Sequence, residues 1–122
     1  MDSILLFVYG TLKRGHRNHR HLAGQEFLGA ACTVPRYRLV DCGAYPGLVD
    51  VPTGGTSIRG ELWRVHGDAL PRLDAFEDVP DTFERRAVAL QEVADPVFAY
   101  FYVRDVSQLR ECGSWEDDKV TR

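Results

Sequence analysis

The chain has 122 residues, of which 44% are apolar and 27% are charged, and its formal net charge is −3. This balance is that of an ordinary globular protein and excludes a disordered chain, while the small negative charge gives no bias toward nucleic acid or acidic lipid. The length fits one domain, residues 1–122, whose core needs no metal or disulfide for support.

The first predicted element is a buried strand followed by a glycine-bracketed loop. Residues 4–9 form a continuous apolar run rich in strand-forming side chains, which predicts a central strand buried on both faces. Gly10 and Gly15 bracket the loop that follows. A short helix is expected over residues 17–23, with Gly24 as its end.

Short strands dominate the middle of the chain. Strands are expected over residues 26–34, 36–41, 48–51 and 58–65, and turn signals separate them. A helix follows. Asp68 stands where its N-cap belongs, Pro71 lies near its first turn, and Pro80 is expected to end it. Its apolar face is predicted from the spacing of Leu70, Leu73 and Phe76.

The last predicted strands cover residues 83–93 and 97–103. The polar, acidic tail over residues 111–122 is expected to be loosely ordered outside a core of about residues 4–103, and only Trp115 stands out in it. About seven short strands with hairpin-length connections and one or two short helices predict an α+β fold. Its centre is expected to be a small, mixed, mainly antiparallel β-barrel.

The cysteine pattern and the lack of long apolar runs bear on location. Cys32, Cys42 and Cys112 are odd in number and widely spaced, which favours free thiols in a reduced, cytoplasmic protein. The early apolar run is too short for a signal peptide, and no stretch approaches the roughly 18 apolar residues of a membrane helix. We expect a monomer or weak homodimer with no nucleic-acid or membrane partner.

The loop after the first strand is one candidate binding site. Gly10 and Thr11 are followed by two cations, Lys13 and Arg14, and then by Gly15. Glycine lets backbone N–H groups turn toward an anion or a developing oxyanion. A simple tight turn is the alternative, and the phosphate-loop spacing G-x-x-x-x-G-K-[ST] is missing.

A second candidate is the acidic end of the predicted helix, with Asp68, Asp74, Glu77 and Asp78 close together. Glu77 follows the apolar Phe76, and a carboxylate in a partly apolar wall has a raised pKa that suits general acid/base chemistry. A solvated helix end is the ordinary alternative. A glycosidase-type carboxylate pair has no further support.

Three histidines, His16, His19 and His21, raise the question of a metal site. They stand between Arg17 and Arg20, whose charges disfavour a divalent cation, so a basic, solvated turn is the favoured interpretation. A nucleic-acid patch would need interleaved aromatic residues. The sequence shows no local signature of a cysteine nucleophile and no G-x-S-x-G motif.

Two segments together resemble the γ-glutamylcyclotransferase-like (AIG2-like) family. They are residues 7–15, with Asn18-His19-Arg20 just after, and residues 73–80, followed by Phe83-Glu84-Arg85. Their order and separation fit this family, as do residues 45–47 and 60–63. The resemblance covers about residues 4–103 and is strongest with the γ-glutamylamine cyclotransferase branch.

The resemblance implies a mixed β-barrel with a cavity at one side, without metal or organic cofactor. It implies that Glu77 is the general acid/base and that a γ-glutamyl amide cyclises to 5-oxoproline, releasing a free amine. The substrate-binding residues that we expect are Tyr9, Gly10, Thr11, Leu12, Tyr45 and Phe83.

Two departures from the family pattern leave the leaving amine open. Asp78 stands where the family often has glycine, and Phe83 stands where tyrosine is common. A non-catalytic module that binds a small molecule or a partner on the same fold is the alternative to an enzyme.

Overall fold

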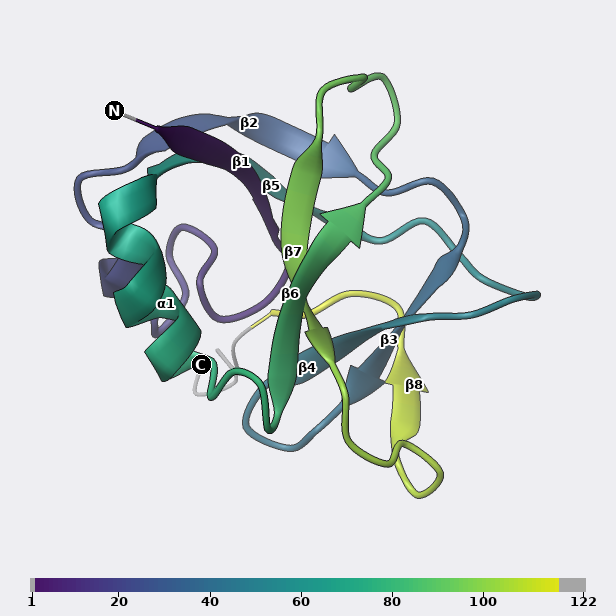
Figure 1. Cartoon of the computed structure of the whole chain (residues 1–122). Coiled ribbons are helices and arrows are strands. Elements are labelled where there is room, and N and C mark those ends of the chain that lie inside the picture. Colours follow the sequence, from purple (N-terminus) through teal and green to yellow (C-terminus); the bar gives the residue numbers. More distant parts are fainter. Residues whose placement is uncertain (1, 117–122) are drawn as a thin grey trace.

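The computed structural model describes residues 2–116, whose strands form one mixed sheet (Figure 1). The strands are β1 Ser3–Val8, β2 Glu26–Cys32, β3 Tyr37–Asp41, β4 Pro46–Asp50, β5 Arg59–His66, β6 Phe83–Val88, β7 Val97–Tyr102 and β8 Arg110–Cys112. The helical elements are α1 Leu70–Phe76 and two 3-10 turns, η1 His19–Leu22 and η2 Gly67–Ala69.

The strand order is β2-β5-β1-β7-β4-β3-β8, and β6 pairs with β7. β7 runs parallel to β1 and β4, whereas the other strand pairs are antiparallel. β1 pairs with β7 near Phe98, and β4 pairs with β7 at Phe101. Both strands therefore pair with β7, and the sheet curls around the core. The predicted α+β fold with a small, mixed, mainly antiparallel barrel is confirmed.

β1 lies at the centre of the sheet and contributes to both halves of the core. Phe7 packs in one apolar cluster, while Leu6 and Val8 pack in the other. Successive side chains of a strand point to opposite faces, so the continuous apolar run of β1 buries both. Helix α1 covers the second cluster with Leu73, which is fully buried.

Helix α1 differs from its prediction at both ends. Pro71 lies in the first turn as predicted, but Asp68 is not the cap, because the turn η2 precedes α1 and no side chain caps either element. The helix ends at Phe76, before Pro80, since Asp78 adopts a left-handed φ of 56°.

Three other elements are shorter than their expected ranges by two residues or more. The helix expected over residues 17–23 is the 3-10 turn η1, and the strand expected over 26–34 ends at Cys32. The strand expected over 83–93 ends at Val88, because the β6–β7 ladder is complete there and the chain enters a loop.

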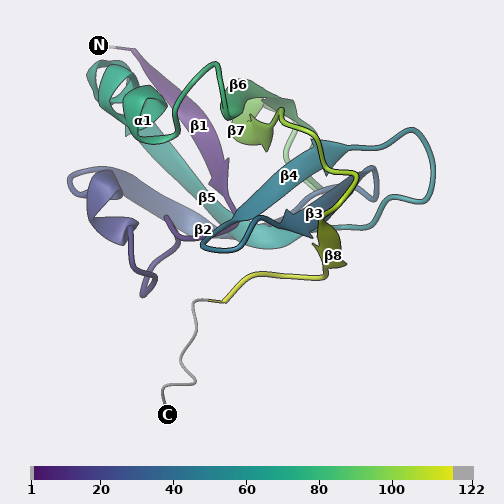
Figure 2. The same ribbon diagram turned by 90° about the horizontal axis from the view of Figure 1, so that it is seen from below.

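The expectation of a loosely ordered tail is wrong for residues 111–116. Strand β8 pairs with β3, and Trp115 packs against the core while its carbonyl accepts a 2.7 Å hydrogen bond from Lys13 Nζ. The segment after β8 runs back alongside the sheet (Figure 2). Residues 117–122 of the expected tail lie outside the described residues.

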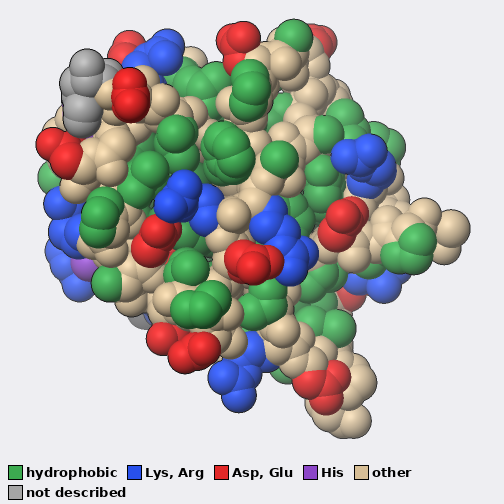
Figure 3. All heavy atoms as spheres, in the orientation of Figure 1, with side chains coloured by type: hydrophobic (Ala, Val, Ile, Leu, Met, Phe, Trp, Pro, Cys, Tyr) green, Lys and Arg blue, Asp and Glu red, His purple; other side chains and the backbone are tan. Residues whose placement is uncertain are grey.

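The surface seen in Figure 3 intersperses acidic and basic side chains. Cys32, Cys42 and Cys112 are free thiols. Over residues 2–116, the structure contains no helix with the length and apolar character needed to cross a membrane.

Candidate active site

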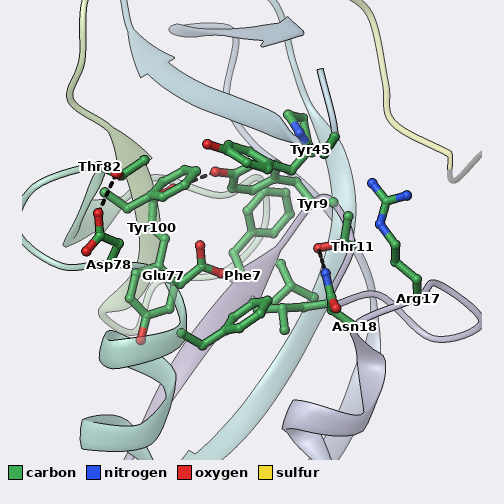
Figure 4. Close-up of a pocket in the computed structure, with 17 residues that line it drawn as sticks. Phe7, Tyr9, Thr11, Arg17, Asn18, Tyr45, Glu77, Asp78, Thr82 and Tyr100 are labelled. Atoms are coloured by element: carbon green, nitrogen blue, oxygen red, sulfur yellow. Dashed lines mark hydrogen bonds between the residues drawn. The ribbon is translucent and has the colours of Figure 1, made fainter. Parts of the chain in front are cut away.

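One cavity of about 400 Å³ lies between the loop after β1, the loop before β4, the end of α1 and β6 (Figure 4). The seven residues singled out from the sequence all line it: Tyr9, Gly10, Thr11, Leu12, Tyr45, Glu77 and Phe83. The size is within the range of small-molecule sites. The fold therefore brings together residues separated by up to 74 positions in the sequence, from Tyr9 to Phe83.

Glu77 lies at the C-cap of α1, where its N–H donates to Leu73 O at 2.9 Å. Its carboxylate points into the cavity (Figure 4) and accepts no hydrogen bond from residues 2–116. Burial disfavours the charged form and raises the pKa of Glu77 from 4.5 to about 7. Such a carboxyl group can accept and return a proton near neutral pH.

Asp78 turns the chain away from the helix with its left-handed φ of 56°. The Thr82 N–H donates to Asp78 O at 2.9 Å, and the Thr82 hydroxyl donates to Asp78 Oδ2 at 2.6 Å. A left-handed φ favours glycine, and aspartate is among the other residues that adopt it. This explains how Asp78 fits a position where the resembling family often has glycine.

The loop after β1 forms the opposite wall, with backbone N–H groups available to a ligand. Its turn is closed by the Lys13 N–H, which donates to Gly10 O at 3.1 Å. Asn18 holds Thr11 twice, through its N–H to Thr11 O at 2.9 Å and through Nδ2 to Thr11 Oγ1 at 3.0 Å. Among residues 2–116, no acceptor pairs with the N–H groups of Gly10, Thr11 and Leu12.

Gly10 is required by a close approach to the next loop. A Cβ atom at this position would lie 2.6 Å from Cγ of Pro46, inside any normal contact distance. Beside Pro46, the Tyr45 ring packs on the Phe83 ring at a centroid distance of 5.7 Å. Phe83 is 5% exposed, so phenylalanine here supplies an apolar wall in place of a hydroxyl.

Tyr9 lines the cavity, but its hydroxyl is bonded to the protein backbone. It donates to Tyr100 O at 2.6 Å and accepts from the Leu48 N–H at 3.2 Å. Burial, and next the charge of Glu77, raise the pKa of Tyr9 well above its ordinary value of 10.0. Tyr9 therefore stays neutral and is a structural part of the wall.

Several lining residues were not singled out from the sequence, among them Arg17, Asn18, Thr82 and Tyr100. Figure 4 shows Arg17 and Asn18 on the loop side and Thr82 and Tyr100 across from them. Asn18 could have been identified as a site residue from the sequence, because it stands in the segment that carries the family resemblance. Tyr100 lies in an aromatic strand, and that pattern does not mark it as a site residue.

The three histidines have different partners. His16 Nε2 lies 3.1 Å from Glu116 Oε1, and His19 Nδ1 lies 3.0 Å from Leu12 O. The His21 ring stacks on Phe76 at a centroid distance of 4.0 Å. Within residues 2–116, no group of three or more His, Cys, Asp or Glu is placed to hold a metal ion.

Comparison with known proteins identifies the family. The family model "Gamma-glutamyl cyclotransferase, AIG2-like" matches residues 6–117. A Vibrio cholerae protein named "Putative gamma-glutamylcyclotransferase" is 38% identical over 111 residues, covering 91% of this chain and 94% of that protein.

Two mouse proteins extend the comparison. The mouse "Gamma-glutamylaminecyclotransferase" is 39% identical over 93 residues, which are 70% of this chain and 62% of the mouse protein. The crystal structure of a mouse AIG2-like protein superposes with a TM-score of 0.84 at 32% identity, covering 95% of this chain and 90% of that one. The chain therefore belongs to the γ-glutamyl cyclotransferase, AIG2-like, family, and the prediction of an enzyme of this type is confirmed.

Proposed function

We propose that the protein converts a γ-glutamyl amide into 5-oxoproline and a free amine, with Glu77 as the general acid/base. The observation that carries this proposal is the cavity itself. An unpaired carboxylate with a pKa of about 7 faces a loop whose N–H groups are unpaired within residues 2–116. A proton acceptor and oxyanion donors on opposite walls are what a cyclising amide cleavage needs.

The reaction begins with the substrate's own α-amine as nucleophile. The neutral amine attacks the γ-carbonyl carbon, which forms the new C–N bond of a five-membered ring, and its proton passes to the Glu77 carboxylate. The N–H groups of Gly10, Thr11 and Leu12 donate to the carbonyl oxygen as it gains negative charge. The carbonyl then re-forms, the old C–N bond breaks, and Glu77 returns the proton to the leaving amine.

The substrate that we favour is a small γ-glutamylamine. A cavity of about 400 Å³ suits a small molecule, and a mouse relative carries γ-glutamylamine cyclotransferase in its name, although the chain spans only 62% of that protein. Tyr45 and Phe83 then form the apolar wall beside the bound substrate. We further propose a cytoplasmic location, since its three thiols are free. For the oligomeric state we propose a monomer or weak homodimer.

The test is 5-oxoproline release from a panel of γ-glutamyl amides in the presence of a chelator. Wild type, Glu77→Gln and the control Glu26→Gln are compared; Glu26 has a side chain 63% exposed on β2. We expect release by wild type and by the control, and a rate lower by about 10²- to 10⁴-fold in Glu77→Gln. Equal release by Glu77→Gln would refute the assigned role, and binding of 5-oxoproline without any release would favour the non-catalytic module.

A further inference from the structure

A partly buried cluster of polar side chains lies next to the cavity, centred on Asp74. Arg85 donates to its carboxylate twice, through Nε at 3.0 Å and Nη2 at 2.9 Å. The Tyr100 hydroxyl donates to Asp74 Oδ1 at 2.7 Å. Asp74 and Arg85 have side chains 24% and 29% exposed, so this is a partly buried, bidentate ion pair, which is among the stronger polar contacts in proteins.

Asp74 lies three residues before Glu77, so both side chains leave the same side of α1. Helix α1 has seven residues and no side-chain cap, and helices this short depend on tertiary contacts for their position. Asp74 supplies such contacts, because Arg85 lies on β6 and Tyr100 on β7. The Val79 N–H also donates to Asp74 O at 3.0 Å, which ties the turn after Glu77 to the same residue.

The network continues across the cavity. The carbonyl of Tyr100 accepts the hydrogen bond from Tyr9, whose hydroxyl also accepts from the Leu48 N–H of β4. The end of α1 is thereby connected through β7 to the start of the loop after β1. Glu77 itself has no side-chain hydrogen bond within residues 2–116, so its placement depends on these neighbours and on packing.

The charged and titratable groups around Glu77 come from several elements. Tyr9, Tyr45 and Tyr100 face it, and burial is the largest cause of their raised pKa values. For Tyr100 the hydrogen bond to Asp74 and the Asp74 charge come next, and the Glu77 charge raises all three pKa values further. These phenols stay neutral near pH 7. The charged groups are Asp78 next in the chain, Arg17 across the cavity, and the pair of Asp74 and Arg85. Burial is the cause of the raised Glu77 pKa.

We propose that Asp74, Arg85 and Tyr100 form a clamp that positions Glu77 against the cavity and keeps its surroundings charge-balanced. The effect of the clamp on catalysis rests on the proposed function, but its effect on the Glu77 titration can be measured without any enzymatic activity. Removing one charge of the pair leaves the other uncompensated near Glu77. The two single variants should therefore shift the Glu77 titration in opposite directions.

The test is a ¹³C NMR titration of the Glu77 carboxyl group in the full chain, with Glu77→Gln used to assign the signal. In Asp74→Asn, the uncompensated Arg85 cation should lower the Glu77 pKa by about half a unit or more. In Arg85→Gln, the uncompensated Asp74 anion should raise it by a similar amount. The double variant should return toward wild type, and Arg86→Gln, on the same strand with a side chain 50% exposed, is the matched control.

Kinetics supply the second readout. Asp74→Asn, Arg85→Gln and the double variant should each lose roughly 10- to 100-fold in kcat with a smaller change in KM. The reason is that Glu77 is misplaced in these variants while the binding loop is intact. If Arg85→Gln fails to fold, Arg85→Lys keeps the charge but loses the bidentate geometry. Arg85→Lys should lower kcat without changing the Glu77 pKa.

The outcomes separate the clamp from the proposed function. Opposite shifts together with no 5-oxoproline release by wild type would support the clamp and refute the function. Shifts in the same direction, or none, with wild type active would overturn the clamp and leave the function standing.

Discussion

At the scale of single residues, the site is governed by the cost of burying a charge. Glu77 lines the cavity together with the rings of Phe7, Phe83 and Tyr100, and its carboxylate has no hydrogen-bond donor from residues 2–116. The same desolvation that makes it a better base makes its ionised form unfavourable in the folded protein. The burial that suits Glu77 to act as a base therefore lowers the stability of the folded protein when Glu77 is ionised.

This cost of burial predicts a pH-dependent effect of Glu77→Gln on stability. The Glu77 pKa is about 7 in the folded state and near 4.5 when unfolded, so wild type loses stability as pH rises through this window. The change corresponds to at most about 3 kcal/mol. Urea unfolding should show that the unfolding free energy of Glu77→Gln, relative to that of wild type, rises by up to this amount between pH 4.5 and pH 8. A difference between Glu77→Gln and wild type that is independent of pH would contradict the burial of Glu77.

A second prediction at this scale concerns Gly10. In Gly10→Ala the new methyl group meets Pro46 Cγ at 2.6 Å, and a proline ring has little freedom to move, so the loop must shift. We expect a loss of roughly 1–3 kcal/mol in unfolding free energy and a rise in KM for the γ-glutamyl substrate. Gly113→Ala is the control, since nothing lies within 4 Å of its Cβ. Unchanged stability and KM in Gly10→Ala would show that the loop tolerates the displacement.

At the scale of elements, the sequence predicted the strands with strong apolar patterns and missed the one without. β1 follows from its apolar run, and α1 from Leu70, Leu73 and Phe76. β8 has exposed Arg110 and Glu111 and lies at the sheet edge, so no alternation marks it. It forms because the chain returns beside β3, which is a long-range effect that local patterns do not encode.

The segment after β8 leads to a prediction about Lys13. Its side chain is 10% exposed and donates to Trp115 O at 2.7 Å and Glu116 Oε2 at 3.3 Å, next to the turn that Gly10 begins. Lys13→Met removes both hydrogen bonds and should therefore lower the unfolding free energy. The loss should be only about 1 kcal/mol, because Glu116, 66% exposed, is readily solvated after the change.

The same variant should raise KM more than it lowers kcat, because Lys13 touches the binding loop and lies apart from Glu77. Steady-state kinetics and thermal unfolding, with exposed Arg59→Met on β5 as control, check both effects. A kcat loss with constant KM would argue against a role in holding the loop.

At the scale of the whole molecule, the cavity exists only because the sheet curls. The acid comes from the end of α1, the N–H donors from the loop after β1, and the apolar wall from the loop before β4 and from β6. Six of the seven candidates were predictable from the two segments that carry the family resemblance, and Tyr45 from the turn at residues 45–47. Asn18's bond to Thr11 and the clamp of Asp74, Arg85 and Tyr100 were not, because they depend on which strands become neighbours.

A formed cavity should bind the product without turnover. 5-Oxoproline at a hundredfold excess over its Kd should raise the unfolding free energy by about 2.7 kcal/mol in wild type and in Glu77→Gln alike. Calorimetric Tm measurements over a range of product concentrations would show this, and Gly10→Ala should respond less. No stabilisation of wild type at any concentration would show that the folded protein does not bind 5-oxoproline.

The most direct test of the central claim is the rate of 5-oxoproline release from one accepted γ-glutamylamine at pH 8, for wild type and Glu77→Gln. A positioned acid/base contributes about 10²- to 10⁴-fold. We predict a loss of that size in Glu77→Gln, with 5-oxoproline still bound and the fold intact. A Glu77→Gln rate within about tenfold of wild type would contradict it, because another group would then have to move the proton.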